Sequence, residues 1–118
     1  MAKMYQLSNC KTCQRILGEL GEQPGLEVSN IKETAITAEE LDHMAELAGS
    51  YEALFSRRAM KYRSMGLADQ DLSEADYRRL ILEEYTFLKR PVTVVGDQIF
   101  IGSAKKSVQG TKTALAAD

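Results

Sequence analysis

The sequence contains no tryptophan, two prolines and two cysteines in 118 residues, and aromatic residues make up 7% of it. Two cysteines are too few for a small secreted scaffold held together by several disulfides. Because 44% of the residues are hydrophobic and 27% are charged, a collagen-like or disordered chain is excluded as well. The composition is typical of one ordinary globular domain, since a chain of this length forms a single core.

Long hydrophobic runs are also missing. The longest apolar runs are about five residues, whereas a membrane-spanning helix needs about 20. The N-terminal residues lack the apolar stretch and small-residue cleavage site of a signal peptide. We therefore expect a cytoplasmic protein that does not contact a membrane.

The net charge is only −2, but the charge is unevenly distributed along the chain. Residues 1–50 carry a net charge of −4 and residues 51–118 a net charge of +2. A pI of about 5.5 is not the strong basic excess of a nucleic-acid-binding protein, so no direct contact with nucleic acid is expected. The basic residues of the second half are interpreted as solvated helix faces or as a local anion- or protein-docking surface.

The first third of the chain predicts a β-α-β unit. Residues Ala2–Leu7 alternate in polarity and fit a strand, and Leu26–Ile31 fit a second strand. Between them a helix is predicted to begin at Cys10 or Lys11 and to end at Gly21. Such a unit implies two parallel strands joined by a right-handed crossover.

The middle of the chain predicts helices. Thr37 with Glu40 forms a capping-box pattern, and Ser73 with Asp76 begins another helix. A shorter helix is expected over 51–55, and a loop over 64–71. The inward residues of the last of these helices are predicted to be Tyr77, Leu80, Ile81 and Tyr85.

The last third returns to strands. Residues 92–95 and 98–101 are predicted to form a hairpin around the Gly96-Asp97 turn. Ser103 is a candidate cap of a final helix with Val108 and Leu115 inward, in which Gly110 costs about 1 kcal/mol relative to alanine. We predict an α/β fold with a four-stranded mixed sheet, formed by one domain over residues 1–118 with a helical insertion at about 35–86.

The segment Cys10-Lys-Thr-Cys13 contains both cysteines and lies where the first strand passes into the first helix. Unpaired amides and the positive end of the dipole at a helix N-terminus favour a thiolate. Such settings lower a cysteine pKa from about 8.5 to roughly 3.5–7.5. Cys13 lies one turn later on the apolar stripe and is expected to be buried. This asymmetry suits an exposed attacking thiolate and a shielded resolving thiol.

Three other interpretations compete with redox chemistry. A zinc site is disfavoured, because two cysteines and the lone His43 do not provide four ligands. A structural disulfide is disfavoured by the short loop and by a reducing cytosol. Two incidental cysteines in a core helix remain an alternative, although CxxC beside a β-α-β pattern is a fairly specific redox signal. His43 is interpreted as a structural or surface residue.

Lys89-Arg90-Pro91 is the second feature with chemical meaning. Proline at the first position of a strand is permitted in a sheet. The start of this strand can lie beside the N-terminus of the first helix, so Arg90 is a candidate to face Cys10. An isolated surface charge is the alternative. We expect the bond before Pro91 to be cis.

The combination of motifs resembles the arsenate reductase-like family. It comprises CxxC after the first strand, a helical insertion, the segment Tyr62–Ala68 with its Gly-Leu-Ala, and Lys89-Arg90-Pro91-Val92 before a hairpin. The resemblance covers the chain from Lys3 to about Val108. It implies a thioredoxin fold, shared with the glutathione- or glutaredoxin-dependent arsenate reductases and the Spx transcriptional regulators.

The resemblance also implies roles for individual residues. Cys10 matches the family's nucleophile, and Arg90 and Pro91 match its arginine and cis-proline. The two further arginines with which arsenate reductases bind the oxyanion align with Ser56 and Gly102. Cys13, where the reductases usually have serine, matches the CxxC redox switch of the Spx-like members.

Two functions follow from this resemblance. The first is a thiol-dependent oxidoreductase, in which Cys10 attacks an oxyanion or disulfide, Cys13 resolves the adduct, and Lys11, Thr12 and Pro91 contact the substrate. No cofactor is expected to be bound, and glutathione, glutaredoxin or a thioredoxin-type protein is the expected reductant. The alternative is an Spx-like redox sensor that docks on the RNA polymerase alpha subunit.

Overall fold

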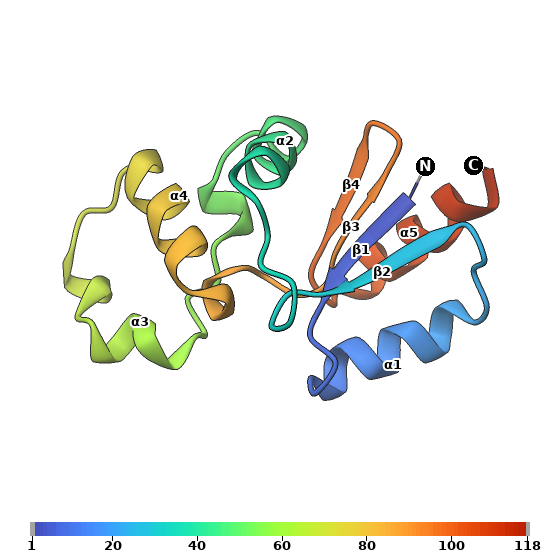
Figure 1. Ribbon diagram of the computed structural model, residues 1–118, viewed down its shortest axis with the longest axis horizontal. Coiled ribbons are helices and arrows are strands. Elements are labelled where there is room, and N and C mark those ends of the chain that lie inside the picture. The colour runs from blue at the N-terminus through green and yellow to red at the C-terminus, as the bar shows by residue number, and fades with distance from the viewer. Residues whose placement is uncertain (1, 118) are drawn as a thin grey trace. The chain divides into compact units, whose positions relative to one another are not determined.

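The computed structural model of the protein describes residues 2–117 (Figure 1). Its strands are β1 (Ala2–Gln6), β2 (Leu26–Asn30), β3 (Val92–Val95) and β4 (Gln98–Ile101). Its α-helices are α1 (Lys11–Leu20), α2 (Ala38–Ala48), α3 (Met60–Ser64), α4 (Glu74–Glu83) and α5 (Lys105–Ala117). Three short 3-10 helices are η1 (Glu52–Leu54), η2 (Leu67–Asp69) and η3 (Tyr85–Phe87).

The chain forms two compact units. The first comprises Met1–Ala35 with Arg90–Asp118, and the second comprises Ile36–Lys89. The second unit is the helical insertion that the sequence predicts, with its end three residues later than expected. The organisation of both units as a single domain stays a prediction.

The first unit contains the four-stranded mixed sheet that the sequence predicts, and the strand order in the structure is β2-β1-β3-β4. β1 pairs with β2 in parallel, with Met4 opposite Val28. β1 pairs with β3 antiparallel, with Met4 opposite Thr93, and β3 continues into β4 through the predicted hairpin. Gly96 in the hairpin turn has a φ of 61°, a conformation that glycine adopts without steric cost.

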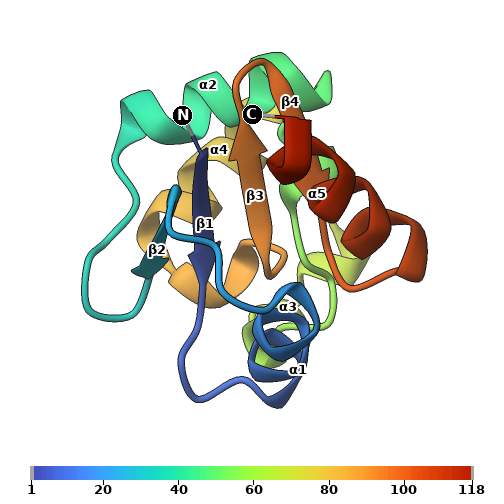
Figure 2. The ribbon, with the colours of Figure 1, turned by 90° about the vertical axis from the view of Figure 1, so that its right-hand side faces the viewer.

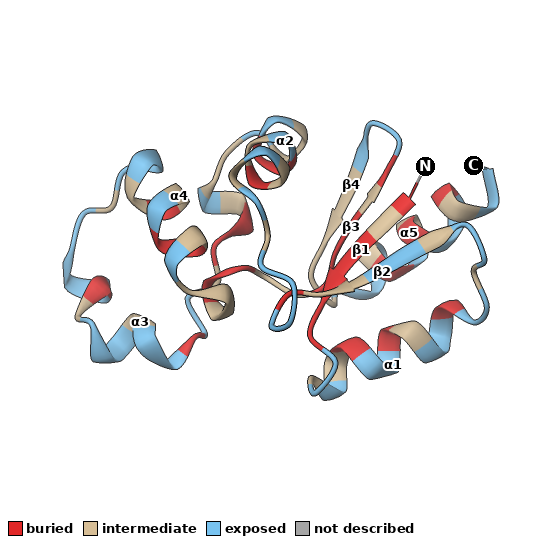
Figure 3. Cartoon of the chain, viewed as in Figure 1, coloured by how far each residue is buried: buried red, intermediate tan, exposed pale blue. Residues whose placement is uncertain are grey.

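Helices α1 and α5 lie on the same face of this sheet (Figure 2). Met4 of β1 packs there against Ile16 and Leu20 of α1 and Val108 of α5. Burying one such side chain stabilises the fold by about 1.5–3 kcal/mol. The two central strands carry most of the buried residues of the sheet (Figure 3). The predicted amphipathic pattern of α1 is therefore confirmed.

The second unit is built on capped helices and an aromatic cluster. Thr37 and Ser73 form complete capping boxes with Glu40 and Asp76, as predicted. Phe55 is fully buried, and the members of its aromatic cluster are Tyr62, Tyr77 and Phe87. The stacked Phe55 and Phe87 rings have centroids 5.0 Å apart.

Three details of the second unit differ from the predictions. The loop predicted over 64–71 contains η2 (Leu67–Asp69), and the other two differences concern Tyr85 and α3. Tyr85 does not belong to the inward stripe of α4, because that helix ends at Glu83 and Glu84 has an extended backbone. The Glu84 carboxylate then accepts a hydrogen bond from the Thr86 amide and begins η3. Helix α3 was not predicted, since none of its residues is buried and it has no hydrophobic period.

Among residues 2–117, no helix is long and apolar enough to cross a membrane.

Candidate active site

The two cysteines lie where β1 leaves the sheet and α1 begins. Cys10 is the N-cap residue of α1, and its carbonyl accepts the first helical hydrogen bond from the Gln14 amide at 3.0 Å. The Cys10 amide donates to the Leu7 carbonyl at 3.0 Å, which holds the turn in place. The Gln14 side-chain amide donates to the Ser8 carbonyl at 2.7 Å and ties the helix to the same turn. The CxxC segment is therefore held at both ends.

Cys10 is the half-buried cysteine of the pair, and its environment favours a thiolate. Burial by itself raises the pKa of Cys10, but hydrogen bonding to Cys13 and Thr12 and the charge of Arg90 lower this pKa below the ordinary value. The Cys10 side chain does not form a regular N-cap hydrogen bond. The Cys13 and Thr12 amides nevertheless stabilise the negative charge of its sulfur. This is the stabilisation that the positive end of a helix provides.

Cys13 is fully buried, with an exposed fraction of 0%. Burial and the neighbouring Cys10 together raise the pKa of the Cys13 thiol to about 11, against the opposing effects of the Leu7 amide and Arg90. Cys13 is thus the proton-bearing partner that donates to the Cys10 sulfur. The predicted difference in burial and acidity between the two cysteines is present in the structure.

Arg90 is separated from the first residue of β3 by Pro91 alone. It lies near both sulfurs, since its charge favours the thiolate and lowers the pKa of Cys10 and of Cys13. The Arg90–Pro91 bond is cis, as predicted. The Arg90 Nη1 atom is buried and has no hydrogen-bond partner among residues 2–117. A guanidinium with an unused donor beside a thiolate is suited to binding an anion.

The other predicted residues have different surroundings. Thr12 is half-buried and acts on Cys10 through its amide, Pro91 is buried, and Lys11 is exposed. The Pro91 carbonyl accepts a hydrogen bond from the Gly102 amide at 2.9 Å. The exposure of His43 agrees with its interpretation as a surface residue.

The position aligned with the first of the family's further arginines, Ser56, belongs to the second unit. Its amide donates to the Phe87 carbonyl at 2.7 Å. Among residues 2–117, no group of three or more histidine, cysteine and acidic side chains is arranged to hold a metal ion.

Two polar groups where β1 ends were not predicted from the sequence. The Leu7 amide acts on Cys13, and a backbone amide leaves no signal in the sequence. Gln6, the last residue of β1, is 4% exposed, and its Oε1 atom has no partner among residues 2–117. A signal for Gln6 existed, because it alternates with the buried Met4 and so belongs to the same face of β1.

Comparison with known proteins assigns the family. The model of the ArsC family matches residues 5–111 of the chain. The chain belongs to the ArsC family. The uncharacterized protein YusI of Bacillus subtilis is 29% identical over 103 residues, which cover 83% of this chain and 86% of YusI.

Solved structures show the same fold. An arsenate reductase from Vibrio cholerae superposes with a TM-score of 0.79 at 22% identity, over 92% of this chain and 95% of that chain. An arsenate reductase related protein from Brucella melitensis superposes with a TM-score of 0.69 at 21% identity, over 92% of each chain. The predicted family and thioredoxin-like fold are therefore confirmed, with a CxxC pair at the start of α1.

Proposed function

We propose that this chain is a thiol-dependent oxidoreductase in which Cys10 is the nucleophile, Cys13 the resolving thiol and Arg90 the group that holds negative charge beside the sulfur. The observation that carries this proposal is the opposite effect of the site on the two cysteines. The pKa of Cys10 is lowered while burial raises the pKa of Cys13 to about 11. A pair with this asymmetry has one thiolate ready to attack and one thiol held in reserve.

The reaction takes place in two exchanges. The Cys10 thiolate attacks one sulfur of a substrate disulfide, forms a mixed disulfide and releases the first substrate thiolate. Cys13 then loses its proton and attacks the Cys10 sulfur, which releases the second thiolate and forms the Cys10–Cys13 disulfide. The substrate gains two electrons and the protein loses two, which an external thiol reductant restores.

An oxyanion substrate follows the same sequence. Arsenate forms an adduct on Cys10 with loss of water, and attack by Cys13 on the Cys10 sulfur releases arsenite. Arg90 is placed to bind the oxyanion, and Lys11, Thr12 and Pro91 are proposed to contact the substrate. The proposed reductant is glutathione, glutaredoxin or a thioredoxin-type protein of the cytoplasm. Neither step needs a metal or a bound cofactor.

The test is a single-turnover experiment on the reduced protein with a small aromatic disulfide, and separately with arsenate, both in the absence of any other thiol. The wild-type chain is expected to lose two thiols per molecule and to stay monomeric by mass spectrometry. Cys13→Ser is expected to stop at a stable Cys10 mixed disulfide, and Cys10→Ser is expected to be inert. Intermolecular dimers, or no loss of thiols, would contradict the proposal.

The second candidate is an Spx-like redox sensor whose Cys10–Cys13 disulfide changes a docking surface for the RNA polymerase alpha subunit. The observation that favours it is the lack of arginine at the two aligned positions, Ser56 and Gly102, in a chain that has CxxC. The two functions are separated by arsenate or disulfide turnover on one side and by redox-dependent binding to purified alpha subunit on the other. Repeated turnover without such binding favours the enzyme.

A further inference from the structure

A groove lies between α1 and α5. Both helices cover the same face of the sheet (Figure 2). The volume of the groove is about 480 Å³, which lies within the range of small-ligand sites. The buried Val108 contributes an apolar wall, and the remaining lining side chains are polar or charged. All of its lining residues belong to the first unit, the unit that also contains Cys10, Cys13 and Arg90.

The groove has an excess of positive charge in a protein whose net charge is −2. Arg15, Lys105 and Lys112 line it, against Glu19 as the one carboxylate of the lining. Glu19 is already bound to Arg15, with Nη1 and Oε1 2.9 Å apart. Neither lysine has a hydrogen bond or ion pair to any of residues 2–117. The two lysines are therefore the unneutralised charges of the groove.

The start of α5 adds to this field. Its first turn contains no acidic residue, whereas Lys105 and Lys106 are placed at the positive end of the helix dipole. Cations are unfavourable at that end, and a bound anion relieves the repulsion. In α2 and α4 the same position is occupied by acidic residues. The groove thus attracts negative charge through its side chains and through the helix that forms its wall.

The spacing of the lysines indicates what kind of anion fits. Lys105 and Lys112 are seven residues apart, so they project from the same side of α5 about 10 Å apart. In a polyproline II segment, residues i and i+3 project to the same side about 9 Å apart. Gln109 lies between the lysines and offers an amide to the backbone of such a segment.

We propose that the α1–α5 groove binds an extended acidic peptide segment with two carboxylates three residues apart. Ser103 lines one end of the groove. The residue before it, Gly102, donates its amide to the Pro91 carbonyl at 2.9 Å. A bound segment therefore extends toward the cis-proline corner beside Arg90. Its role, to hold the acidic flank of a protein disulfide near Cys10, rests on the proposed function, whereas its binding does not.

The binding test uses the reduced protein and a peptide without sulfur, so it is independent of the thiol chemistry. Ac-Glu-Pro-Pro-Glu-NH2 is titrated by isothermal calorimetry at low salt, with Ac-Gln-Pro-Pro-Gln-NH2 and inorganic phosphate as comparison ligands. The acidic peptide is expected to bind at least fivefold more tightly than either comparison ligand. Equal binding of phosphate would overturn the proposal in favour of a simple anion site.

Exposed charges of the groove allow matched variants. The double variant Lys105→Gln/Lys112→Gln is expected to weaken peptide binding at least fivefold, and Glu19→Gln to strengthen it about twofold. Lys105→Gln alone is expected to weaken peptide binding about threefold. Lys106→Gln makes the same single charge change at the next residue but does not line the groove, so it is expected to change the affinity less than twofold. An effect of Lys106→Gln as large as that of Lys105→Gln would show attraction by net charge alone and overturn the site.

Discussion

At the scale of the residue, the chemistry of this protein depends on the different environments of two cysteines one helical turn apart. Cys10 is at the N-terminal end of α1, where backbone amides and Arg90 stabilise negative charge. Cys13 is one turn later, on the buried face of α1, and has no contact with solvent. The same residue type thus has opposite acid–base behaviour at the two positions, because solvation and the local field differ.

Cys10 is expected to react first with iodoacetamide. Its pKa is lowered while that of Cys13 is raised to about 11, so the rate of alkylation follows the Cys10 thiolate fraction, with a midpoint below that of a free thiol. Peptide mapping after partial alkylation over a pH series measures this rate for each cysteine. Equal rates at the two positions, or faster reaction of Cys13, would contradict the assignment.

Arg90 is expected to act both on the thiolate and on a bound anion. Arg90→Lys keeps the charge and is expected to change the pKa of Cys10 little, but it weakens oxyanion binding because an ammonium lacks the planar fork. Arg90→Ala is expected to raise the pKa of Cys10 and to weaken binding. Protection of Cys10 from alkylation by sulfate or arsenate measures the binding; protection equal to wild type in Arg90→Ala would exclude Arg90 from the site.

At the scale of the element, the two exposed or half-buried helix glycines of the first unit differ in their neighbours. Gly18 of α1 has no heavy atom within 4 Å of the position of an added Cβ. At Gly110 of α5, an added Cβ would lie 2.7 Å from Cε1 of Phe100 on β4. Gly110 is therefore required for close approach of α5 to the sheet, which the local pattern alone does not reveal.

Alanine substitutions at these glycines are expected to have opposite effects on stability. Gly18→Ala should raise the free energy of unfolding by about 0.5–1 kcal/mol, since alanine loses less backbone entropy on folding. Gly110→Ala should lower it by about 1 kcal/mol or more, because the Phe100 ring must move from its packed position. Urea denaturation of both variants measures the difference; stabilisation by both would show that Phe100 yields without cost.

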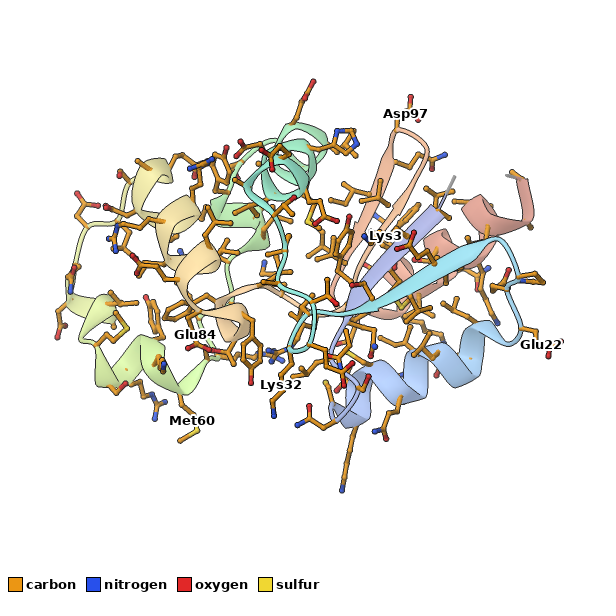
Figure 4. The ribbon with its side chains drawn as sticks, viewed as in Figure 1. Lys3, Glu22, Lys32, Met60, Glu84 and Asp97 are labelled. Atoms are coloured by element: carbon orange, nitrogen blue, oxygen red, sulfur yellow. The ribbon has the colours of Figure 1, made fainter. Side chains whose placement is uncertain are left out.

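The short helix α3 is another element whose identity depends on its surroundings. None of its residues is buried, and Met60 is 89% exposed, with its side chain projecting away from the helix into solvent (Figure 4). The Lys61 ammonium is bonded to the Glu84 carboxylate at 2.6 Å, which ties α3 to the end of α4. Because the Lys61 side chain stays largely in water, the pair adds little to stability.

At the scale of the whole molecule, the cysteine pair links stability to pH. The lowered pKa of Cys10 means that the unfolded chain binds more protons below the ordinary thiol pKa, so stability rises with pH up to about 9. Burial raises the pKa of Cys13 to about 11, so above pH 9 the folded chain binds more protons and stability falls as pH rises. The reduced protein is therefore expected to be most stable near pH 9.

The measurement is urea denaturation of the reduced protein between pH 7 and 11, compared with Cys13→Ala. The variant is expected to lose stability less steeply above pH 9, with a difference on the order of 1 kcal/mol at the upper end. Tyr51 and Lys61, whose pKa values are also raised, lower the stability of both proteins at high pH and cancel in the comparison. Identical slopes would show that the Cys13 thiol titrates as freely as in the unfolded chain.

Much of the fold was predictable because its signals are local. The inward stripe of α1, the capping boxes at Thr37 and Ser73 and the hairpin turn at Gly96 depend on residues a few positions apart. The position of Cys10 at a helix start is equally local. Where a local rule failed, as at Tyr85, a carboxylate of the preceding residue began a new turn in competition with the continuing hydrophobic period.

The sequence by itself determined the order of strands and helices, the CxxC pair at the start of α1 and the membership of a family. Only the tertiary structure decided what surrounds that pair. The charge of Arg90, 80 residues after Cys10 in the chain, reaches both sulfurs because β3 pairs with β1. The close approach at Gly110 and the cationic groove between α1 and α5 also arise from contacts between distant segments. Such contacts depend on the packing of complete elements, and no short stretch of sequence contains them.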